Sequence, residues 1–415
     1  MQHKADNNTV LIPHLFRQEY TKMTAVLCRH FGLEHMEIAE DIASETFLKA
    51  TEHWAAYGVP DNPAGWLYTV AKNKAKDYLK RHQLFETRIK NAVKPEETAP
   101  QYDFEFNDSI IADSLLSMIF AVCDPVNSPE AQVCLALQIL CGFSVGEIAN
   151  AFLSKTETIK KRLLRARASL RTGSFQIRLL SGEEINKRMD SVLKTLYLLF
   201  NEGYFSQSDN LLIRKDLCAE ALRLALLLVE NKLTNTPEAN ALLSLMCFQS
   251  SRLDARVDDN GEAILYEDQD KDRWDRFLIE KGNHYLLAAF PHKHISKYHL
   301  EASIAYWHTT TRPDKWEHIL NLYNQLIIIE YSPVTALSRT FAYAKVYGNE
   351  KAIAEAEKLN LAESSYYHGL LGYLYTGQNP AIAISHYRKA IELSKSTQEK
   401  KTLEGKISQL AVNSL

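Results

Sequence analysis

The sequence predicts an all-α protein built from more than one domain. Three observations predict it. Apolar residues recur at steps of three and four in the N-terminal half, two helix-capping patterns flank a tight turn near residue 153, and strand-like alternation is nearly absent from the C-terminal half. The length of 415 residues suits two or three domains, and 46% hydrophobic with 24% charged residues is typical of a soluble globular protein.

Residues 142–171 show the most informative pattern, two short predicted helices around a tight turn. Ser144 precedes Glu147 by three residues. Ser154 precedes Glu157 by the same spacing, so each serine is predicted to start a helix with a capping box. In the second helix an apolar stripe at Ile159, Leu163, Ala166 and Leu170 is surrounded by the basic residues Lys160, Lys161, Arg162, Arg165, Arg167 and Arg171. This pattern predicts a helix-turn-helix whose second helix enters a DNA major groove.

Positive charge is concentrated in two stretches, although the formal net charge of the chain is −3. Residues 155–171 hold seven basic residues against one acid, and residues 72–94 hold eight basic residues against two acids. A basic run on a single helix is usually a solvated face, but the paired capping boxes favour DNA binding for the first run. Any affinity for nucleic acid must therefore come from local patches rather than from the charge of the whole chain.

The sequence also argues against several classes of function. It contains no Walker loop, nucleophile elbow or HExxH motif, so we expect neither an enzyme nor a cofactor. The six cysteines lack CxxC spacing and are expected to be buried free thiols. Metal binding is not expected either, because regular ligand spacing is missing at His284, His292, His294 and His299. No apolar signal segment and no membrane-spanning run are present, which favours a cytoplasmic location without membrane contact.

A long predicted helix over residues 36–57 has one apolar side and one acidic side. A shorter helix, residues 15–31, is predicted to precede it and to end at Gly32. The apolar stripe runs through Ala39, Ala43, Thr46, Phe47, Ala50 and Trp54, and the acidic side carries Glu37, Glu40, Asp41, Glu45 and Glu52. This acidic side is either a solvated surface or a docking surface for a basic partner, and its composition leaves both open.

A third helix is predicted to begin with Asn62 as its N-cap and Pro63 as its first residue. Its apolar side carries Trp66, Leu67, Val70, Ala71, Ala75 and Tyr78, and its other sides carry Lys72, Lys74, Lys76, Lys80 and Arg81. Trp66 belongs to the apolar stripe, which favours a place in the core over a role in base stacking.

The two N-terminal motifs together resemble a known family. AEDIASETFLKATEHW followed by NPAGWLYTVAKNKAKDYLKR is similar to conserved region two of the extracytoplasmic-function (ECF) sigma factors, and residues 142–171 resemble their region four. The order of the motifs and the linker between them also fit the family. The resemblance covers about the first 175 residues.

The resemblance implies a role for each surface. The acidic helix would dock on the β′ clamp helices of RNA polymerase through Asp41, Glu45, Phe47 and Leu48. The loop and the basic helix after it would recognise and melt the −10 promoter element through Asp61, Asn62, Asn73, Lys76, Lys80 and Arg81. The second helix of the helix-turn-helix would read the −35 element as duplex DNA through Thr158, Lys160, Lys161, Arg162 and Arg165.

The stretch that joins the two regions is polar and contains two prolines, which predicts a flexible tether. Four parts are therefore expected: a sigma region-2 helical bundle over residues 10–85, a linker over 86–108, a region-4 helix-turn-helix domain over 109–174, and a C-terminal domain over 175–415. Similar sigma factors with long extensions have Cys-Cys-His-Pro near residue 123. This chain has Asp124 in place of the histidine, which argues against a metal or redox site there.

The C-terminal half is predicted to be a helical-repeat domain. NEGYF (201–205), RKDLCAEALRLALLL (214–228) and DQDKDRWDR (268–276) resemble stretches of the extended sigma-factor subfamily, which implies an extension of tetratricopeptide-like (TPR) hairpins. The local pattern agrees, because small and aromatic residues follow the TPR order at Leu371, Gly372, Tyr375, Ala383, Tyr387 and Ala390. Residues 316–330 and 333–347 are predicted to form another helix pair.

The leading hypothesis is an ECF-type sigma factor that is regulated by its fused C-terminal domain. Its partners would be the RNA polymerase core, through the β′ clamp helices and the β subunit, promoter DNA, and a protein or peptide ligand of the repeats. The alternative is a stand-alone helix-turn-helix regulator with a TPR-like interaction domain. That alternative leaves the acidic helix and the first basic helix unexplained. A scaffold that has lost DNA binding is disfavoured by the basic residues on both helices.

Overall fold

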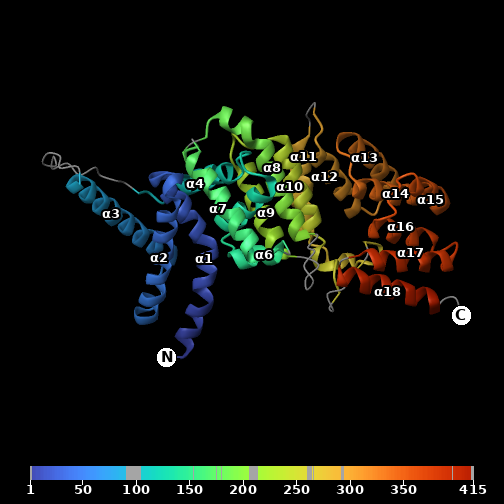
Figure 1. The fold of residues 1–415 in the computed structure, drawn as a ribbon, viewed down its shortest axis with the longest axis horizontal. Coiled ribbons are helices and arrows are strands. Elements are labelled where there is room, and N and C mark those ends of the chain that lie inside the picture. Colours follow the sequence, from blue (N-terminus) through green and yellow to red (C-terminus); the bar gives the residue numbers. More distant parts are fainter. Residues whose placement is uncertain are drawn as a thin grey trace. The chain divides into compact units, whose positions relative to one another are not determined.

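The computed structural model describes residues 2–89, 104–152, 154–173, 175–178, 180–204, 214–258, 264, 266–290, 294–394 and 396–412. Throughout these ranges the regular elements are helices (Figure 1), so the all-α prediction is confirmed. The chain forms two compact units. Unit 1 comprises residues 1–149 and 154–195, and unit 2 comprises residues 150–153 and 196–415.

Three helices form the N-terminal bundle of unit 1. They are α1 (Gln2–Phe31), α2 (Met36–Tyr57) and α3 (Pro63–Ile89), with the short 3-10 turn η1 (Leu33–His35) between the first two. The apolar stripe predicted for α2 is buried, and Trp54 packs edge-to-face on Trp66 of α3 with ring centroids 5.4 Å apart. The side chain of Asn62 accepts a hydrogen bond from the Gly65 amide at 2.9 Å, which confirms the predicted N-cap of α3.

The stretch predicted as a linker is more ordered at its ends than its composition indicated. Helix α3 continues to Ile89. At the other end Phe104 is fully buried against His30 and Phe31 of α1, and Phe106 stacks on Tyr68 at 4.8 Å. Aromatic side chains inside the acidic run therefore anchor it to the bundle. Residues 90–103 lie outside the described residues.

The second part of unit 1 contains the predicted helix-turn-helix. It consists of α4 (Asp108–Val122), α5 (Pro129–Leu135) continued by a π turn (Ala136–Leu140), α6 (Val145–Ala151) and α7 (Thr156–Thr172). The first capping box forms as predicted, because the Glu147 amide donates to Ser144 Oγ at 3.2 Å and the Ser144 amide donates to the Glu147 carboxylate at 2.8 Å. The buried stripe on α7 is also confirmed.

The second predicted capping box, from Ser154 to Glu157, is wrong. Helix α7 begins one residue later, at Thr156, and Lys155 occupies the N-cap position without a side-chain cap. Lysine carries only donors, so it offers no acceptor for the free amides of the first turn. The carbonyl of Lys155 instead accepts from the amides of Thr158 and Ile159, at 2.9 and 3.2 Å.

Helix α8 (Gly182–Tyr204) begins at a third capping box, in which Ser181 and Glu184 bond reciprocally. Its first half belongs to unit 1, which therefore extends to Thr195, beyond the domain boundary predicted near residue 174. The rest of unit 2 consists of α9 (Lys215–Glu230), α10 (Pro237–Ser250), α11 (Arg276–Ala289), α12 (Lys297–Thr309), α13 (Lys315–Ile329), α14 (Pro333–Tyr347), α15 (Asn349–Glu357), α16 (Ser365–Tyr375), α17 (Pro380–Leu393) and α18 (Thr397–Val412).

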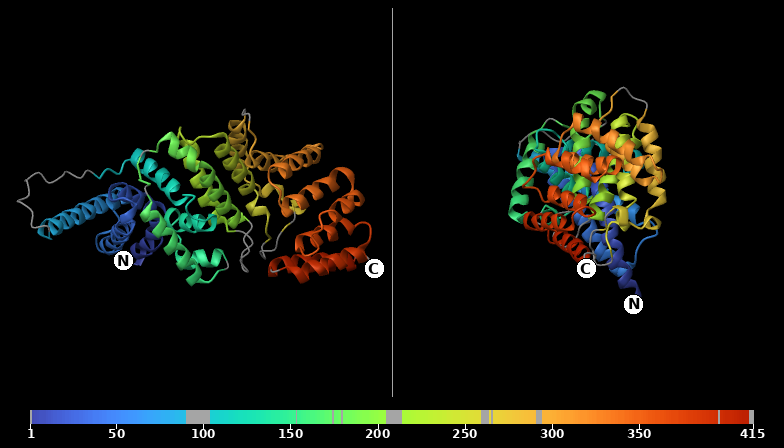
Figure 2. Two further views of the ribbon diagram at one scale, coloured as in Figure 1. Left: turned by 45° about the horizontal axis from the view of Figure 1, so that its top comes forward. Right: turned by 90° about the vertical axis from the view of Figure 1, so that its right-hand side faces the viewer.

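Helices α10 to α18 pack as a series of neighbours, each against the next (Figure 2). Short 3-10 turns η3 (Leu253–Ala255), η4 (Tyr266–Asp268) and η5 (Lys271–Arg273) lie between α10 and α11 in the chain. The TPR-like pair predicted at the C-terminal end corresponds to α16 and α17, with Ala383, Tyr387 and Leu371 in the core. The backbone of Gly372 lies against the Tyr387 ring, so close that a Cβ at this position would be 2.6 Å from ring carbons.

Replacing Gly372 with alanine is expected to destabilise unit 2 by about 1–3 kcal/mol, because the new methyl group would force the Tyr387 ring out of its packing position. Urea unfolding of the full chain measures this effect. Gly369→Ala on the same helix is the control, since no described atom lies within 4 Å of its added Cβ and alanine favours a helix by roughly 1 kcal/mol over glycine. A similar loss in both variants would show that α16 responds to any side chain rather than to this contact.

Candidate nucleic-acid and polymerase interfaces

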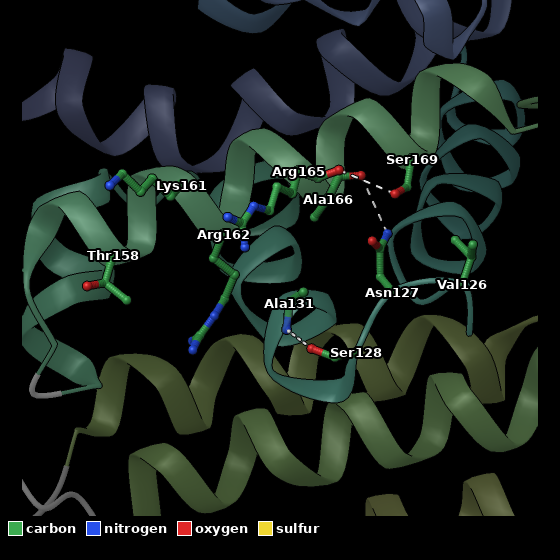
Figure 3. Close-up of a pocket in the computed structure, with 10 residues that line it drawn as sticks. All are labelled: Val126, Asn127, Ser128, Ala131, Thr158, Lys161, Arg162, Arg165, Ala166 and Ser169. Carbon is green, nitrogen blue, oxygen red and sulfur yellow. Dashed lines mark hydrogen bonds between the residues drawn. The ribbon is translucent and has the colours of Figure 1, made fainter.

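Helix α7 presents a cationic surface beside a cleft of about 460 Å³ (Figure 3). Thr158, Lys161, Arg162 and Arg165 line the cleft from α7, and Asn127 and Ser128 line it from the start of α5. Of the residues predicted to read the −35 element, Thr158, Lys160, Lys161 and Arg165 are exposed. Arg162 is half-buried and donates to Cys134 Sγ at 3.7 Å, so it also braces α7 against α5. Cations around a concave, solvated groove can hold phosphate oxygens.

The loop before α5 is held in place by a buried amide. Gln132 Nε2 donates to the backbone carbonyls of Asp124 and Asn127, both at 2.9 Å. Its carbonyl oxygen accepts from Thr195 Oγ1 at 2.7 Å and from Ser191 at 3.1 Å, both on α8. The wall of the cleft opposite α7 is thus fixed by the first half of α8.

Asp124 has a structural role that its place in the sequence did not reveal. Its carboxylate accepts from Arg188 of α8 at 2.9 Å and 3.2 Å, and both side chains are largely buried. The two residues lie 64 positions apart, so helical spacing could not pair them. The neighbouring Cys123 is buried, and burial raises the pKa of its thiol to about 12, so the thiolate that would bind a metal is disfavoured.

The acidic side of α2 is exposed where the family resemblance places polymerase binding. Asp41 and Glu45 are exposed, and Leu48 beside them leaves 60% of its surface to solvent. Phe47 faces the opposite way and packs on the ring of Phe16 at 5.0 Å, so it supports the helix from inside. Of the four predicted docking residues, three therefore share the surface and one lies in the core.

A second cleft, of about 480 Å³, separates the acidic helix from the basic one. Glu45 bridges it through an ion pair with Lys74 at 2.6 Å, and Asp41 and Arg81 also line it. Most residues predicted to bind the −10 element are exposed, namely Asp61, Asn62, Asn73, Lys80 and Arg81, and Lys76 is half-buried. Arg81 donates to the backbone carbonyl of Asp77 at 3.3 Å, and its side chain is exposed.

The C-terminal turns of α7 contact α2. Arg167 binds Glu40 in a bidentate arrangement, with N–O distances of 2.9 and 2.7 Å, and its Nε donates to Gln138 at 3.0 Å. Arg171 forms an ion pair with Glu37, one turn earlier on α2. Two of the six basic residues counted on this helix, Arg167 and Arg171, therefore hold the helix-turn-helix against the N-terminal bundle. We call these two ion pairs the latch.

The described residues contain no group of three or more His, Cys, Asp or Glu side chains arranged to hold a metal ion. His299 caps α12 through Ser296, and His292 lies outside the described residues. All six cysteines are buried and none is joined in a disulfide, and burial raises the thiol pKa of Cys218 and Cys247 to about 12. Among the described helices, none is long and apolar enough to cross a membrane.

This combination of an acidic helix, a basic helix and a helix-turn-helix defines a sigma-type transcription protein. Residues 15–85 match the model of Sigma-70 region 2, and residues 188–290 match a family of unknown function, DUF6596. The chain belongs to the ECF sigma factors and carries a long C-terminal extension, in which the DUF6596 match lies.

One similar protein covers nearly the whole chain, and others cover less than half of it. An uncharacterized protein of Rhizobium meliloti (strain 1021) is 33% identical over 400 residues, 93% of this chain and 92% of its own length. The ECF RNA polymerase sigma factor BldN of Streptomyces coelicolor is 30% identical over 131 residues, 31% of this chain and 47% of BldN. The RNA polymerase sigma factor YlaC of Bacillus subtilis is 28% identical over 162 residues, 39% of this chain and 90% of YlaC. No solved structure matches the chain significantly.

Replacing Glu40 with glutamine is expected to weaken the latch by about 1–3 kcal/mol, because it removes the charge that the half-buried Arg167 faces while keeping the shape of the side chain. Hydrogen–deuterium exchange should become roughly tenfold faster or more at the C-terminal turns of α7. The matched control is Glu157→Gln, whose pairing with Lys160 is exposed and 4.0 Å long. If the control accelerated exchange as much as the Glu40 variant, the latch would have no special role.

Proposed function

We propose that the chain directs the core enzyme of bacterial RNA polymerase to specific promoters and starts transcription there. The observation that supports this most strongly is the cationic cleft on α7. The exposed side of α7 carries Lys161, Arg165 and Thr158, and its opposite side is a buried apolar stripe that keeps the helix packed in the domain. The exposed side could therefore contact a DNA duplex while the helix stays folded. Long cationic side chains bind phosphates and guanine edges in the major groove, which is how α7 would read the −35 element.

The start of α3 and its basic side are proposed to recognise and melt the −10 element. Asp61 and Asn62 lie exposed at the N-terminal end of the helix, and Lys80 and Arg81 lie exposed several turns later. Backbone phosphates of an opened strand need such cations, and an unstacked base needs a pocket at the loop. The Asn62 side chain already caps the helix, so it would present its free amide hydrogens to a base.

The exposed side of α2 is proposed to dock on the β′ clamp helices. Asp41 and Glu45 supply negative charge, and Leu48 supplies an exposed apolar side chain between charged neighbours. An apolar anchor inside a charged rim is the usual composition of a protein interface. The chain would thus act in the cytoplasm, as a specificity subunit that catalyses no reaction itself.

Unit 2 is proposed to regulate the sigma activity in place of a separate anti-sigma factor. Its stacked helices offer the kind of surface with which repeat proteins bind proteins or peptides. The competing hypothesis is a stand-alone DNA-binding regulator. Such a regulator has no need for an exposed acidic and apolar surface on α2, whereas a polymerase subunit has.

Run-off transcription with purified core polymerase and the full chain tests the proposal. A sigma factor makes core polymerase start at defined promoters and co-purifies with it at a one-to-one ratio. A regulator of the alternative kind would bind DNA without forming a stoichiometric complex with core polymerase, and that result would contradict the proposal.

Replacing Lys161 and Arg165 together with alanine is expected to lower transcription from promoters that depend on the −35 element by roughly 10- to 100-fold, because two contacts of about 1 kcal/mol or more are lost. The salt dependence of promoter binding should also become shallower. Binding to core polymerase, measured by gel filtration, should not change. Lys187→Ala, an exposed lysine on α8 away from the cleft, serves as the control.

Replacing Leu48 with alanine is expected to weaken binding to core polymerase about tenfold, because the side chain loses apolar area that would be buried in the complex. Fluorescence titration of labelled chain with core polymerase measures this affinity. Leu164 is a matched control, since it is similarly exposed, at 66%, but lies on α7. Equal weakening by Leu164→Ala, or none by Leu48→Ala, would rule out α2 as the docking surface.

A further inference from the structure

One face of the repeat helices in unit 2 is covered by a short acidic segment of the same chain. The segment is η4, Tyr266–Asp268, which we call the strap. Its three side chains contact residues of α12, α13, α14, α16 and α18. Four of these five are alternate helices of the series. In stacked helix pairs alternate helices line the same face, and repeat proteins use such extended faces to bind partners.

Tyr266 anchors the strap in an aromatic and cationic setting. Its hydroxyl donates to the backbone carbonyl of His308 on α12 and accepts from Lys315 Nζ of α13 at 3.3 Å. Its ring meets the His308 ring edge-to-face, with centroids 4.7 Å apart, and lies 6.4 Å from Trp316. The Arg252 guanidinium stands 5.4 Å from the ring centroid. These contacts form a half-closed site for an aromatic ring with a hydroxyl group.

Glu267 occupies a site built by two further helices. Its carboxylate forms an ion pair with Lys345 of α14 and accepts a hydrogen bond from the Tyr373 hydroxyl of α16 at 3.2 Å. Lys345 also donates to Tyr373 at 2.7 Å, and its ammonium group lies 5.2 Å from the Phe341 ring centroid. The cation is therefore held in place by aromatic side chains whether or not a carboxylate is bound.

Asp268 extends the pattern to the last helix, through Lys406 of α18 at 3.8 Å. The carboxylates of Glu267 and Asp268 are exposed, and exposed ion pairs contribute only about 0–1 kcal/mol each. The strap is thus held by one aromatic anchor and by weak polar contacts. A segment held in this way can be displaced by a competing ligand that offers the same groups.

We propose that this face is a docking site for an acidic peptide of a partner protein, in which an aromatic residue precedes two carboxylates, and that the partner binds by displacing the strap. The strap itself indicates the chemistry of the ligand, because it places a tyrosine and two acids against Lys315, Lys345 and Lys406. This inference goes beyond the sigma activity and does not depend on it, since every residue that carries it lies in unit 2.

A fluorescent peptide with the sequence of residues 264–270 tests the proposal in the full chain. Bound intramolecularly, the strap competes at an effective concentration in the millimolar range, so the unmodified chain should bind the peptide weakly. The double variant Glu267→Gln, Asp268→Asn removes the strap's charges without changing its shape. Fluorescence anisotropy should show about tenfold tighter binding of the peptide by this variant, as expected for the loss of two weak ion pairs.

Further variants separate this site from general charge effects. Adding Lys345→Met to the double variant should abolish the gain, whereas adding Lys389→Met, which removes a lysine paired with Glu392 on α17, should not. Circular dichroism and urea unfolding confirm that each variant is folded. Binding that does not tighten in the double variant, or that is insensitive to Lys345→Met, overturns the proposal. Equally effective competition by a single-stranded oligonucleotide would show a general polyanion site and would overturn it as well.

Discussion

The bidentate ion pair between Arg167 and Glu40 is the interaction on which the arrangement of unit 1 depends. It joins residues 127 positions apart and leaves the two side chains only 15% and 21% exposed, so removing either partner leaves a half-buried charge. The same helix α7 therefore has two cationic sides with different tasks. One side is held against α2, and the other remains free for a ligand at the cleft.

Much of the fold followed from local patterns. The bounds of α2 and the start of α3 agree with the prediction, because Gly58 closes one helix at a positive φ of 89° and Asn62 caps the next. The buried stripe of α7 also agrees, since helical period alone decides which residues face the core. The start of α7 could not be predicted in the same way, because the local pattern favoured Ser154 as the cap, whereas the helix begins after Lys155, whose side chain makes no cap hydrogen bond.

The features that could not be predicted from the sequence are contacts between residues far apart in the chain. The pairs Asp124–Arg188 and Glu267–Lys345 carry no periodic signal and arise only once the helices have packed. The candidate site shows the same limit. Family resemblance assigned Phe47 and Leu48 to one docking surface, but neighbouring residues on a helix point about 100° apart, and only Leu48 faces solvent. The sequence pattern was enough to predict a docking surface on α2, but the structure was needed to show which of its residues are exposed.

Because all six cysteines are buried, we expect the folded chain to react slowly with thiol reagents. A maleimide or an oxidant attacks the thiolate, which needs both access and a lowered pKa, and neither exists at Cys123, Cys218 or Cys247. A cysteine introduced at one exposed position should therefore be labelled selectively in the otherwise native sequence. Distances between α2, α7 and a promoter could then be followed with dyes during initiation, without first removing natural thiols from the core.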